Sequence, residues 1–323
     1  MKPNHPAGWP LALLLGATLA LHGCNEPAAE VKAPQATAAA ISVQHKLGTT
    51  VINHRPLRAV ALDMNEVDFL DQLGVAVAGM PKDFVPHFLA RYKDDAQVAD
   101  IGSIVQPNLE RVHAARPDLI LITSLQANQY AELSEMAPTL HFDVDYRDSE
   151  AGHVEVIKQH LLSLGEVFGK QALAAQKATE LQARVDQARV VTHERPERAL
   201  VVLHNNGAFS AFGVHSRYGF VFTDLGVKPA TDTLETGLHG QPISSEFIQQ
   251  EDPDILYVVD RTAVMEHRPA LDKETLGNPL LRQTKAWKHD RVVFVDPEAW
   301  YVTAASPTSV ALIVDDVLKG YAN

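Results

Sequence analysis

The sequence predicts an α/β protein made of two αβ lobes, each with a central, mostly parallel sheet, joined by a single long backbone helix. Three observations support this fold class: apolar runs of strand length, segments that recur in the same order in both halves of the chain, and a helical stretch between the halves. Continuous apolar runs are typical of parallel strands that helices cover on both faces. A ligand cleft is expected between the lobes, because ligands bind outside the carboxyl ends of such strands.

The composition is that of a globular chain long enough to bury a large core. The 323 residues are 46% hydrophobic and 21% charged, and the formal net charge is −12. An acidic surface argues against nucleic acid as a partner, because neutralising phosphates requires a basic face. The one cysteine excludes an internal disulfide and any metal site built from several cysteines.

The first residues are predicted to be a targeting segment. Residues 1–23 contain Lys2 and an apolar run, Trp9–Leu21, that is too short to span a bilayer and is typical of a signal peptide. The run ends in Leu-His-Gly-Cys24, which resembles a bacterial lipobox whose cysteine is acylated, although His22 departs from the usual small residue. A plain secretory signal and a stray buried thiol are the alternatives. Residues 24–40 hold few bulky apolar side chains and are predicted to be a flexible tether.

Two passages of the chain match each other in order and nearly in spacing, and they define the predicted lobes, residues 41–149 and 195–323. In the first lobe the segments are Arg58–Leu62, Leu73–Val75, Asn108–Glu110, Pro117–Ile122 and Thr139–Val144. In the second lobe they are Arg198–Val202, Leu225–Val227, Ser244–Glu246, Pro253–Val259 and Val292–Val295. The apolar runs are predicted strands, and the glycine of each Leu-Gly-Val segment is a predicted helix stop.

Residues 150–194 are predicted to link the lobes through helices. Five apolar residues step by three and four and form one helical stripe: Val154, Ile157, Leu161, Leu164 and Phe168. A second helical stretch, Ala172–Val190, follows Gly169. Because the chain crosses between the lobes once, on a stiff element, we expect limited closure when ligand binds.

Sequence motifs for common enzyme and metal chemistry are absent. There is no phosphate-binding loop, no dinucleotide fingerprint, no nucleophile elbow and no HExxH. The chain has 15 histidines, and four of them are predicted to be surface residues: His113, His153, His160 and His289. We expect no set of three or four His, Asp and Glu side chains at strand ends, which argues against a receptor for bare zinc or manganese.

Two segments in the second lobe carry candidate ligand residues. His239 stands between glycines in Thr-Gly-Leu-His-Gly-Gln, where backbone freedom lets the imidazole project from a loop. Tyr301 follows the last predicted strand and is expected at the carboxyl edge of the second sheet. A phenolate is a hard ligand suited to Fe(III), and imidazole completes a mixed oxygen and nitrogen set. The alternatives are a loop histidine bonded to backbone and an aromatic ring packed at a strand end.

Two arginines are expected in the cleft. Arg217 precedes a predicted helix, and Arg261 comes directly after an apolar strand, at the carboxyl edge of the sheet. Guanidinium groups in that position suit an anionic ligand rich in oxygen. The alternative is a salt bridge to Asp260 or Asp224.

The order of four motifs carries a family resemblance. SAFG with SRYG, then HGQPISSEFI, PDILYVVDR and VDPEAWY resemble the ferric-siderophore branch of the bacterial class III periplasmic substrate-binding proteins, in particular its catecholate binders. The likeness runs from about Arg55 to the C-terminus and is densest from Ser210 to Tyr301. It implies a monomeric, non-enzymatic receptor in the periplasm that has no intrinsic cofactor and delivers a ferric siderophore to an inner-membrane ABC permease.

The resemblance also implies roles for individual residues. His239 and Tyr301 match the side chains that fill iron sites left open by a tetradentate siderophore, and Arg217 and Arg261 match arginines that hold catecholate oxygens. Leu125 stands where the family has a third arginine, in Thr-Ser-Leu-Gln. The missing charge favours a less anionic or differently shaped siderophore.

Glu110 and Glu246 match the acidic pair, one in each lobe, that docks onto arginines of the permease. Asn108 and Ser244 can cap the two helices, so the alternative role of each glutamate is to interact with the helix dipole. Acylation of Cys24 would add a membrane anchor. Two alternative functions remain: a receptor for haem, a corrinoid or a citrate-type complex on the same scaffold, and a periplasmic enzyme with His239 as general base.

Overall fold

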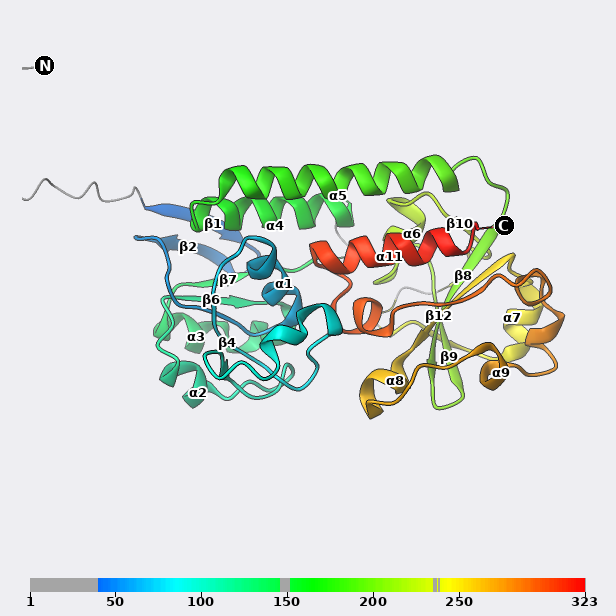
Figure 1. The fold of residues 1–323 in the computed structure, drawn as a ribbon, viewed down its shortest axis with the longest axis horizontal. Coiled ribbons are helices and arrows are strands. Elements are labelled where there is room, and N and C mark those ends of the chain that lie inside the picture. The colour runs from blue at the N-terminus through cyan, green and yellow to red at the C-terminus, as the bar shows by residue number, and fades with distance from the viewer. Residues whose placement is uncertain (1–39, 146–151, 235–236, 238, 323) are drawn as a thin grey trace, which may run out of the picture. The chain divides into compact units, whose positions relative to one another are not determined.

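The computed structural model describes residues 40–145, 152–234, 237 and 239–322 (Figure 1). The predicted signal peptide and nearly all of the predicted tether lie outside these residues, as does the predicted boundary at residues 149 and 150. Within the described ranges, no helix combines the length and the apolar character needed to cross a membrane.

The first lobe is built on a parallel sheet, which in the described ranges has five strands in the order β5-β4-β3-β6-β7. The strands are β3 (Ala59–Ala61), β4 (Val77–Met80), β5 (Ala99–Asp100), β6 (Leu119–Ile122) and β7 (Thr139–His141). The sequence did not predict the antiparallel hairpin of β1 (Ile41–His45) and β2 (Gly48–Ile52) that precedes it. The hydroxyl of Thr50 ties this hairpin to the sheet by donating to the carbonyl of Thr139 at 2.7 Å.

The second lobe is built on a mixed sheet, with six strands in the described ranges. Its order is β11-β9-β8-β12-β13, and β10 also pairs with β8. The strands are β8 (Arg198–Asn205), β9 (Ala208–Phe212), β10 (Lys228–Pro229), β11 (Gln241–Ile243), β12 (Ile255–Asp260) and β13 (Val292–Phe294). β8, β10, β12 and β13 are parallel, whereas β9 and β11 are antiparallel to their neighbours.

Helices cover both faces of the two sheets. The α-helices are α1 (Met64–Gln72), α2 (Leu109–Ala114), α3 (Tyr130–Met136), α4 (His153–Val167), α5 (Gln171–Thr192), α6 (Phe220–Thr223), α7 (Ser245–Glu251), α8 (Arg261–Glu266), α9 (Lys273–Leu276), α10 (Lys285–Lys288) and α11 (Pro307–Lys319). The 3₁₀ turns are η1 (His87–Tyr92), η2 (Ser124–Gln129) and η3 (Leu281–Gln283), and η4 (Glu298–Thr303) is a π-helix. The predicted fold class, two αβ lobes with central and mostly parallel sheets, is confirmed.

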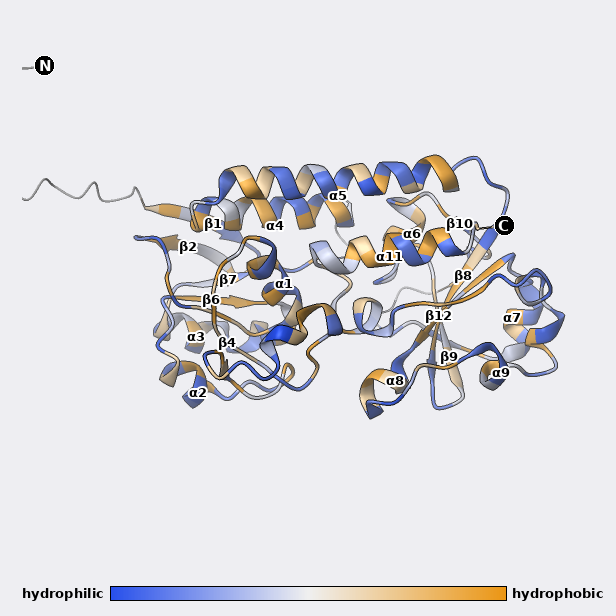
Figure 2. Ribbon diagram, in the orientation of Figure 1, coloured by the Kyte–Doolittle hydropathy of each residue, from blue (hydrophilic) through white to orange (hydrophobic). Residues whose placement is uncertain are grey.

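Alternation along the strands explains how the core is divided. In β6, Leu119 and Leu121 pack in the core that the two lobes share, whereas Ile120 and Ile122 pack in a separate cluster on the other face. β12 behaves in the same way, with Tyr257 facing the shared core. Figure 2 shows β6 and β8 as hydrophobic strands and α5 as a helix of mixed hydropathy. Because both faces of a central strand are buried, its sequence is an apolar run rather than an alternating one.

The aspartate of the repeated Pro-Asp segment makes an equivalent hydrogen bond in each lobe. The Asp118 carboxylate accepts a bond from the backbone N–H of Arg58 at 2.8 Å, and Asp254 accepts from the N–H of Arg198 at 2.9 Å. In each lobe these bonds align the start of two neighbouring parallel strands. These equivalent hydrogen bonds explain why the Pro-Asp segment occurs at the same place in both lobes.

The link between the lobes consists of two helices. α4 and α5 form a hairpin at Gly169, whose φ of +64° is in the left-handed region. Figure 1 shows α5 lying along α4 and reaching from the side of the first sheet to the side of the second. α11 packs against α5 and α1, so helices from distant parts of the sequence close the shared core.

Candidate functional site

A pocket of about 630 Å³ collects the ligand residues that the sequence predicts. Both lobes and α4 contribute to its walls. The predicted residues that line it are Arg217, His239, Arg261 and Tyr301. The structure brings these four side chains to one hollow, and their individual roles stay a prediction.

Tyr301 lies between two guanidinium groups. Nε of Arg261 donates a hydrogen bond to the Tyr301 hydroxyl at 2.7 Å. The Cζ atoms of Arg261 and Arg217 lie 5.4 and 5.6 Å from the centroid of the tyrosine ring. Tyr301 belongs to η4, which follows β13 at the carboxyl edge of the second sheet. The hydrogen bond and the two guanidinium groups make the surroundings of the Tyr301 oxygen electropositive.

Local packing of the Ser-Arg-Tyr-Gly segment positions Arg217. Tyr218 is fully buried, packs edge-on against the ring of Trp300, and donates its hydroxyl to the Trp300 carbonyl at 3.0 Å. A Cβ at Gly219 would lie 2.2 Å from a backbone oxygen, so only glycine fits there. Nη2 of Arg217 donates to the carbonyls of Trp300 and Tyr301 at 3.3 and 3.0 Å.

Arg261 is the first residue of α8, directly after β12. Its Nη1 donates to Oδ1 of Asn205, at the end of β8, at 3.1 Å. The salt bridges considered as alternatives are not formed in the described part of the chain. Asp260 accepts bonds from two backbone N–H groups, and Asp224 accepts the backbone N–H of Val154 at 2.8 Å. The guanidinium groups of Arg217 and Arg261 therefore line the pocket and pair with no carboxylate of residues 40–145, 152–234 or 239–322.

His239 is exposed and lines the pocket from the loop that leads into β11. Gly240 has a φ of +72°, and a Cβ there would lie 2.8 Å from the Ala211 carbonyl oxygen. Only glycine fits at position 240, because of the positive φ and the close approach of the Ala211 carbonyl. Thr236 and Leu238 of the predicted motif lie outside the described residues.

The prediction that His153 and His160 are surface residues is wrong. Both line the pocket from α4. His153 stacks on Phe220 and donates Nε2 to the Ala304 carbonyl at 2.8 Å, and His160 stacks on Phe142. Burial lowers the pKa of His153 to about 4 and that of His160 to about 3, so both are neutral at neutral pH. The two histidines are seven residues apart and lie next to the apolar stripe of α4. This spacing is the sequence signal that could have predicted their position at the pocket. His113 and His289 are exposed, as expected.

The first lobe contributes an acidic wall that the sequence analysis missed. Asp63 follows β3, Glu66 lies on α1, Asp143 comes after β7, and all three line the pocket. The rule that placed Arg261 at a carboxyl edge applies equally to Asp63 and Asp143. Leu125, on η2, lines the same side of the pocket and is 48% exposed.

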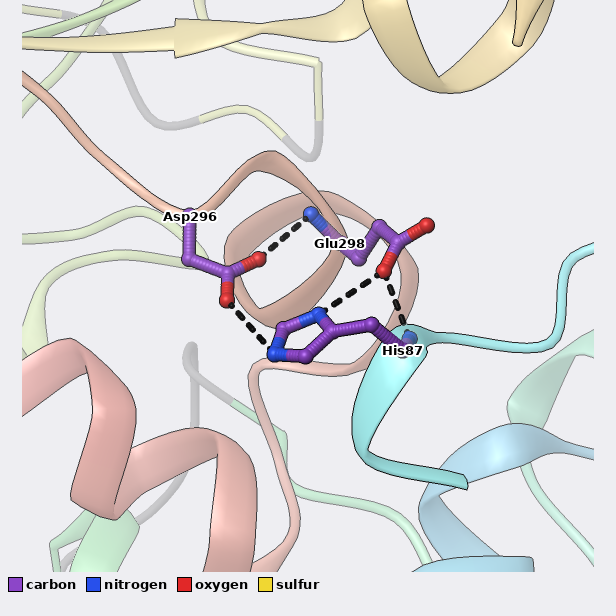
Figure 3. A group of neighbouring side chains, drawn as sticks. All are labelled: His87, Asp296 and Glu298. Carbon is purple, nitrogen blue, oxygen red and sulfur yellow. Dashed lines mark hydrogen bonds and ion pairs between the residues drawn. The ribbon is translucent and has the colours of Figure 1, made fainter. Parts of the chain in front are cut away.

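His87 joins the two lobes outside this pocket. Its ring nitrogens lie 2.9 Å from Oε2 of Glu298 and 3.4 Å from Oδ2 of Asp296, and its backbone N–H donates to the same Glu298 oxygen at 2.7 Å (Figure 3). These three residues are a set of His, Asp and Glu next to a strand end, so the expectation that no such set exists is wrong. His87 is exposed, and both of its ring nitrogens face carboxylates. The three side chains form a polar contact between the two lobes.

Glu110 and Glu246 occupy equivalent places in the two lobes. Each is exposed and lies in the first turn of a helix, and Asn108 and Ser244 are the N-caps, as expected. The bond from its own backbone N–H and the Ser244 hydroxyl lower the pKa of Glu246. A carboxylate on the surface of each lobe is therefore available to a basic partner.

Two αβ lobes with a pocket between the carboxyl edges of their sheets define a solute-binding protein. This chain belongs to the family of periplasmic binding proteins, whose model matches residues 60–299. Family members and relatives are substrate-binding proteins, so the chain is a binding protein of the periplasmic type and not an enzyme.

Several of its relatives are named for the siderophores or iron complexes that they bind. The chain is 57% identical to the ferric-anguibactin-binding protein FatB of Vibrio anguillarum over 96% of this chain and 97% of FatB. It is 30% identical to the petrobactin-binding protein YclQ of Bacillus subtilis over 96% of this chain and 97% of YclQ. Among solved structures, it is similar to BauB bound to a complex of two acinetobactin molecules and ferric iron, with a TM-score of 0.84, 61% identity and coverage of 88% and 99%. It is also similar to the catecholate-siderophore-binding protein VctP of Vibrio cholerae, with a TM-score of 0.81, 28% identity and coverage of 86% and 99%.

Proposed function

We propose that this chain captures a ferric siderophore in the pocket between its lobes and delivers it to an ABC import permease. The observation that carries the proposal is the convergence of Arg217, Arg261 and Tyr301 on one pocket, where neither arginine pairs with a carboxylate of the described residues. An anionic, oxygen-rich complex would satisfy these donors. The names of FatB, BauB and VctP support the same ligand class.

The ligand in this proposal is a catecholate-type complex in which a tetradentate siderophore leaves two iron sites open. The Tyr301 oxygen and the His239 imidazole would fill these sites, and Arg261 would stabilise the phenolate through its existing hydrogen bond. The acidic wall and the lack of an arginine at Leu125 favour a ligand that is not highly anionic. The siderophore supplies the remaining iron ligands.

Delivery would use the two exposed glutamates. Glu110 and Glu246 would contact basic residues of the permease, one from each lobe. Their equivalent placement supports this role, because one surface of the permease could then contact both lobes of this chain. The predicted lipid anchor at Cys24 would hold the protein at the membrane through the tether of residues 24–40.

The test is quenching of intrinsic fluorescence by a panel of ferric siderophores, tetradentate and hexadentate, catecholate and hydroxamate. Trp300 is a suitable reporter because it is fully buried beside Tyr301. We expect saturable quenching by tetradentate ferric catecholates and weaker responses to hydroxamates. Iron-free siderophores are the control. Titration also gives the number of siderophore molecules per protein. The absence of quenching by every ferric complex would contradict the proposal.

A further inference from the structure

Glu66 is a buried acid at the pocket. It lies on α1, is 1% exposed, and lines the pocket from the side of the first lobe. Its Oε2 atom has no hydrogen-bond partner in the described part of the chain. A buried carboxyl oxygen without a donor is costly, so such an atom requires an explanation.

The neighbours of Glu66 make its position less favourable. Burial raises the pKa of Glu66 well above its ordinary value, and the nearby carboxyl groups of Asp63 and Asp143 raise it further. Asp63 accepts bonds from the backbone and side-chain nitrogens of Asn65 at 2.8 and 2.7 Å, and Asp143 accepts from the hydroxyl of Ser124 at 3.1 Å. These donors are neutral. No Lys or Arg forms an ion pair with Asp63, Glu66 or Asp143 within the described residues.

The opposite charges lie in the second lobe. Arg217 and Arg261 line the same pocket and donate to carbonyl oxygens, to Tyr301 and to Asn205, but not to a carboxylate in the described ranges. The second lobe thus supplies the pocket with hydrogen-bond donors and positive charge, and the first lobe supplies it with acceptors and acidic groups. A ligand complementary to both needs an anionic part and a cationic part.

Aromatic rings define the space beside the acid. Phe69, Phe142 and His160 line this part of the pocket, and the last two are stacked with ring centroids 4.4 Å apart. The rings offer flat, uncharged surfaces, because His160 is neutral. A cation next to a carboxylate and aromatic faces is stabilised by both.

We infer that the first-lobe side of the pocket is a subsite for a protonated nitrogen of the siderophore, an amine or a cationic nitrogen heterocycle, with Glu66 as the residue that determines this specificity. The inference rests on the proposed function, because it concerns the non-iron part of the same ligand. The ligand nitrogen donates to Oε2 of Glu66, and the iron centre with its anionic oxygens lies towards Arg217, Arg261 and Tyr301.

The test compares two synthetic tetradentate bis-catecholates with the same iron-binding groups. One has a secondary amine in the middle of its linker, and the other has an ether oxygen at that position. Dissociation constants of both ferric complexes are measured by fluorescence quenching on the wild type, on Glu66→Gln and on Glu132→Gln. Glu132 is an exposed glutamate in the first turn of α3 and does not line the pocket.

We expect the wild type to bind the amine complex about tenfold or more tightly than the ether complex, as one charge-assisted hydrogen bond implies. Glu66→Gln should remove this preference, while Glu132→Gln keeps it. The melting temperature of Glu66→Gln should equal or exceed that of the wild type, because a neutral amide replaces an unpaired buried acid.

Equal binding of the two complexes by the wild type would overturn the subsite and leave the proposed function intact. A preference that persists in Glu66→Gln would also overturn the assignment. Failure of the wild type to bind either complex would instead contradict the proposed function for this ligand class.

Discussion

Arg261 donates its Nε–H to the phenolic oxygen of Tyr301 at 2.7 Å, and this contact connects the end of β12 with the π-helix after β13. The two residues are 40 positions apart in the sequence. Their contact places a guanidinium beside the oxygen that is proposed to bind iron. It also restrains the tyrosine side chain, and a restrained binding group lowers the ordering cost of binding.

The first prediction concerns direct ligation of iron. Tyr301→Phe should weaken binding of a tetradentate ferric catecholate by about tenfold to a hundredfold, as loss of a charged contact worth about 1.5–3 kcal/mol implies. It should also shift the charge-transfer band of the complex. A hexadentate complex, whose iron is already saturated, serves as the control and should be hardly affected. Equal losses for both complexes would show that Tyr301 acts only through packing.

The second prediction concerns the missing arginine. Leu125 is 48% exposed at the pocket, so a longer side chain can be accommodated there. Leu125→Arg should tighten binding of a highly anionic ferric tris-catecholate by about tenfold, because it adds a charge near the ligand. The gain should fall as salt is added. Leu125→Gln, which adds length and polarity without charge, should show no gain, and an equal gain in this variant would refute the electrostatic explanation.

The third prediction separates permease docking from helix capping. Glu110→Gln and Glu246→Gln should each lower uptake of iron from the ferric siderophore by about tenfold, as loss of one interfacial charge pair implies. Ligand affinity, measured by fluorescence quenching, should not change. The matched controls are Glu132→Gln and Glu274→Gln, which also remove a first-turn glutamate. Uptake that falls equally in the controls would indicate that the glutamates only stabilise their helices.

The fourth prediction concerns pH and stability. Asp68 is fully buried on α1, accepts bonds from the N–H and hydroxyl of Thr308 at 2.8 and 2.6 Å, and has a pKa raised by burial to about 6. Between pH 3.8 and about 6 the folded chain holds a proton that the unfolded chain has lost, so stability falls as pH rises through this window.

Asp68→Asn should remove that fall, which amounts to about 3 kcal/mol for a shift of about two pKa units. The measurement is the free energy of urea unfolding at several pH values, taken as the difference between wild type and variant. Asp315→Asn, at an exposed position on α11, is the control and should keep the wild-type slope. A difference between wild type and Asp68→Asn that is independent of pH would contradict the prediction.

Much of the second lobe could be predicted from local sequence. Arg261 follows an apolar run, and the rule that parallel strands end at a common edge places it at the pocket. Tyr301 comes after β13, so the same rule places it at the pocket. The acidic wall was missed although Asp63 obeys the same rule, because a short strand such as β3 gives a weak sequence signal and an acid after a strand is also a common helix cap.

The sequence by itself determined the two αβ lobes, the apolar runs that form their main parallel strands, and the types of side chain at the ends of those strands. Each of these follows from periodicity and from local capping and turn chemistry, which act over a few residues. Only the tertiary structure decided that His153 and His160 line the pocket as half-buried residues, that His87 contacts Glu298, and that Oε2 of Glu66 has no hydrogen-bond partner among the described residues. Burial and charge pairing depend on which distant segments pack together, and no local pattern in the chain specifies those neighbours.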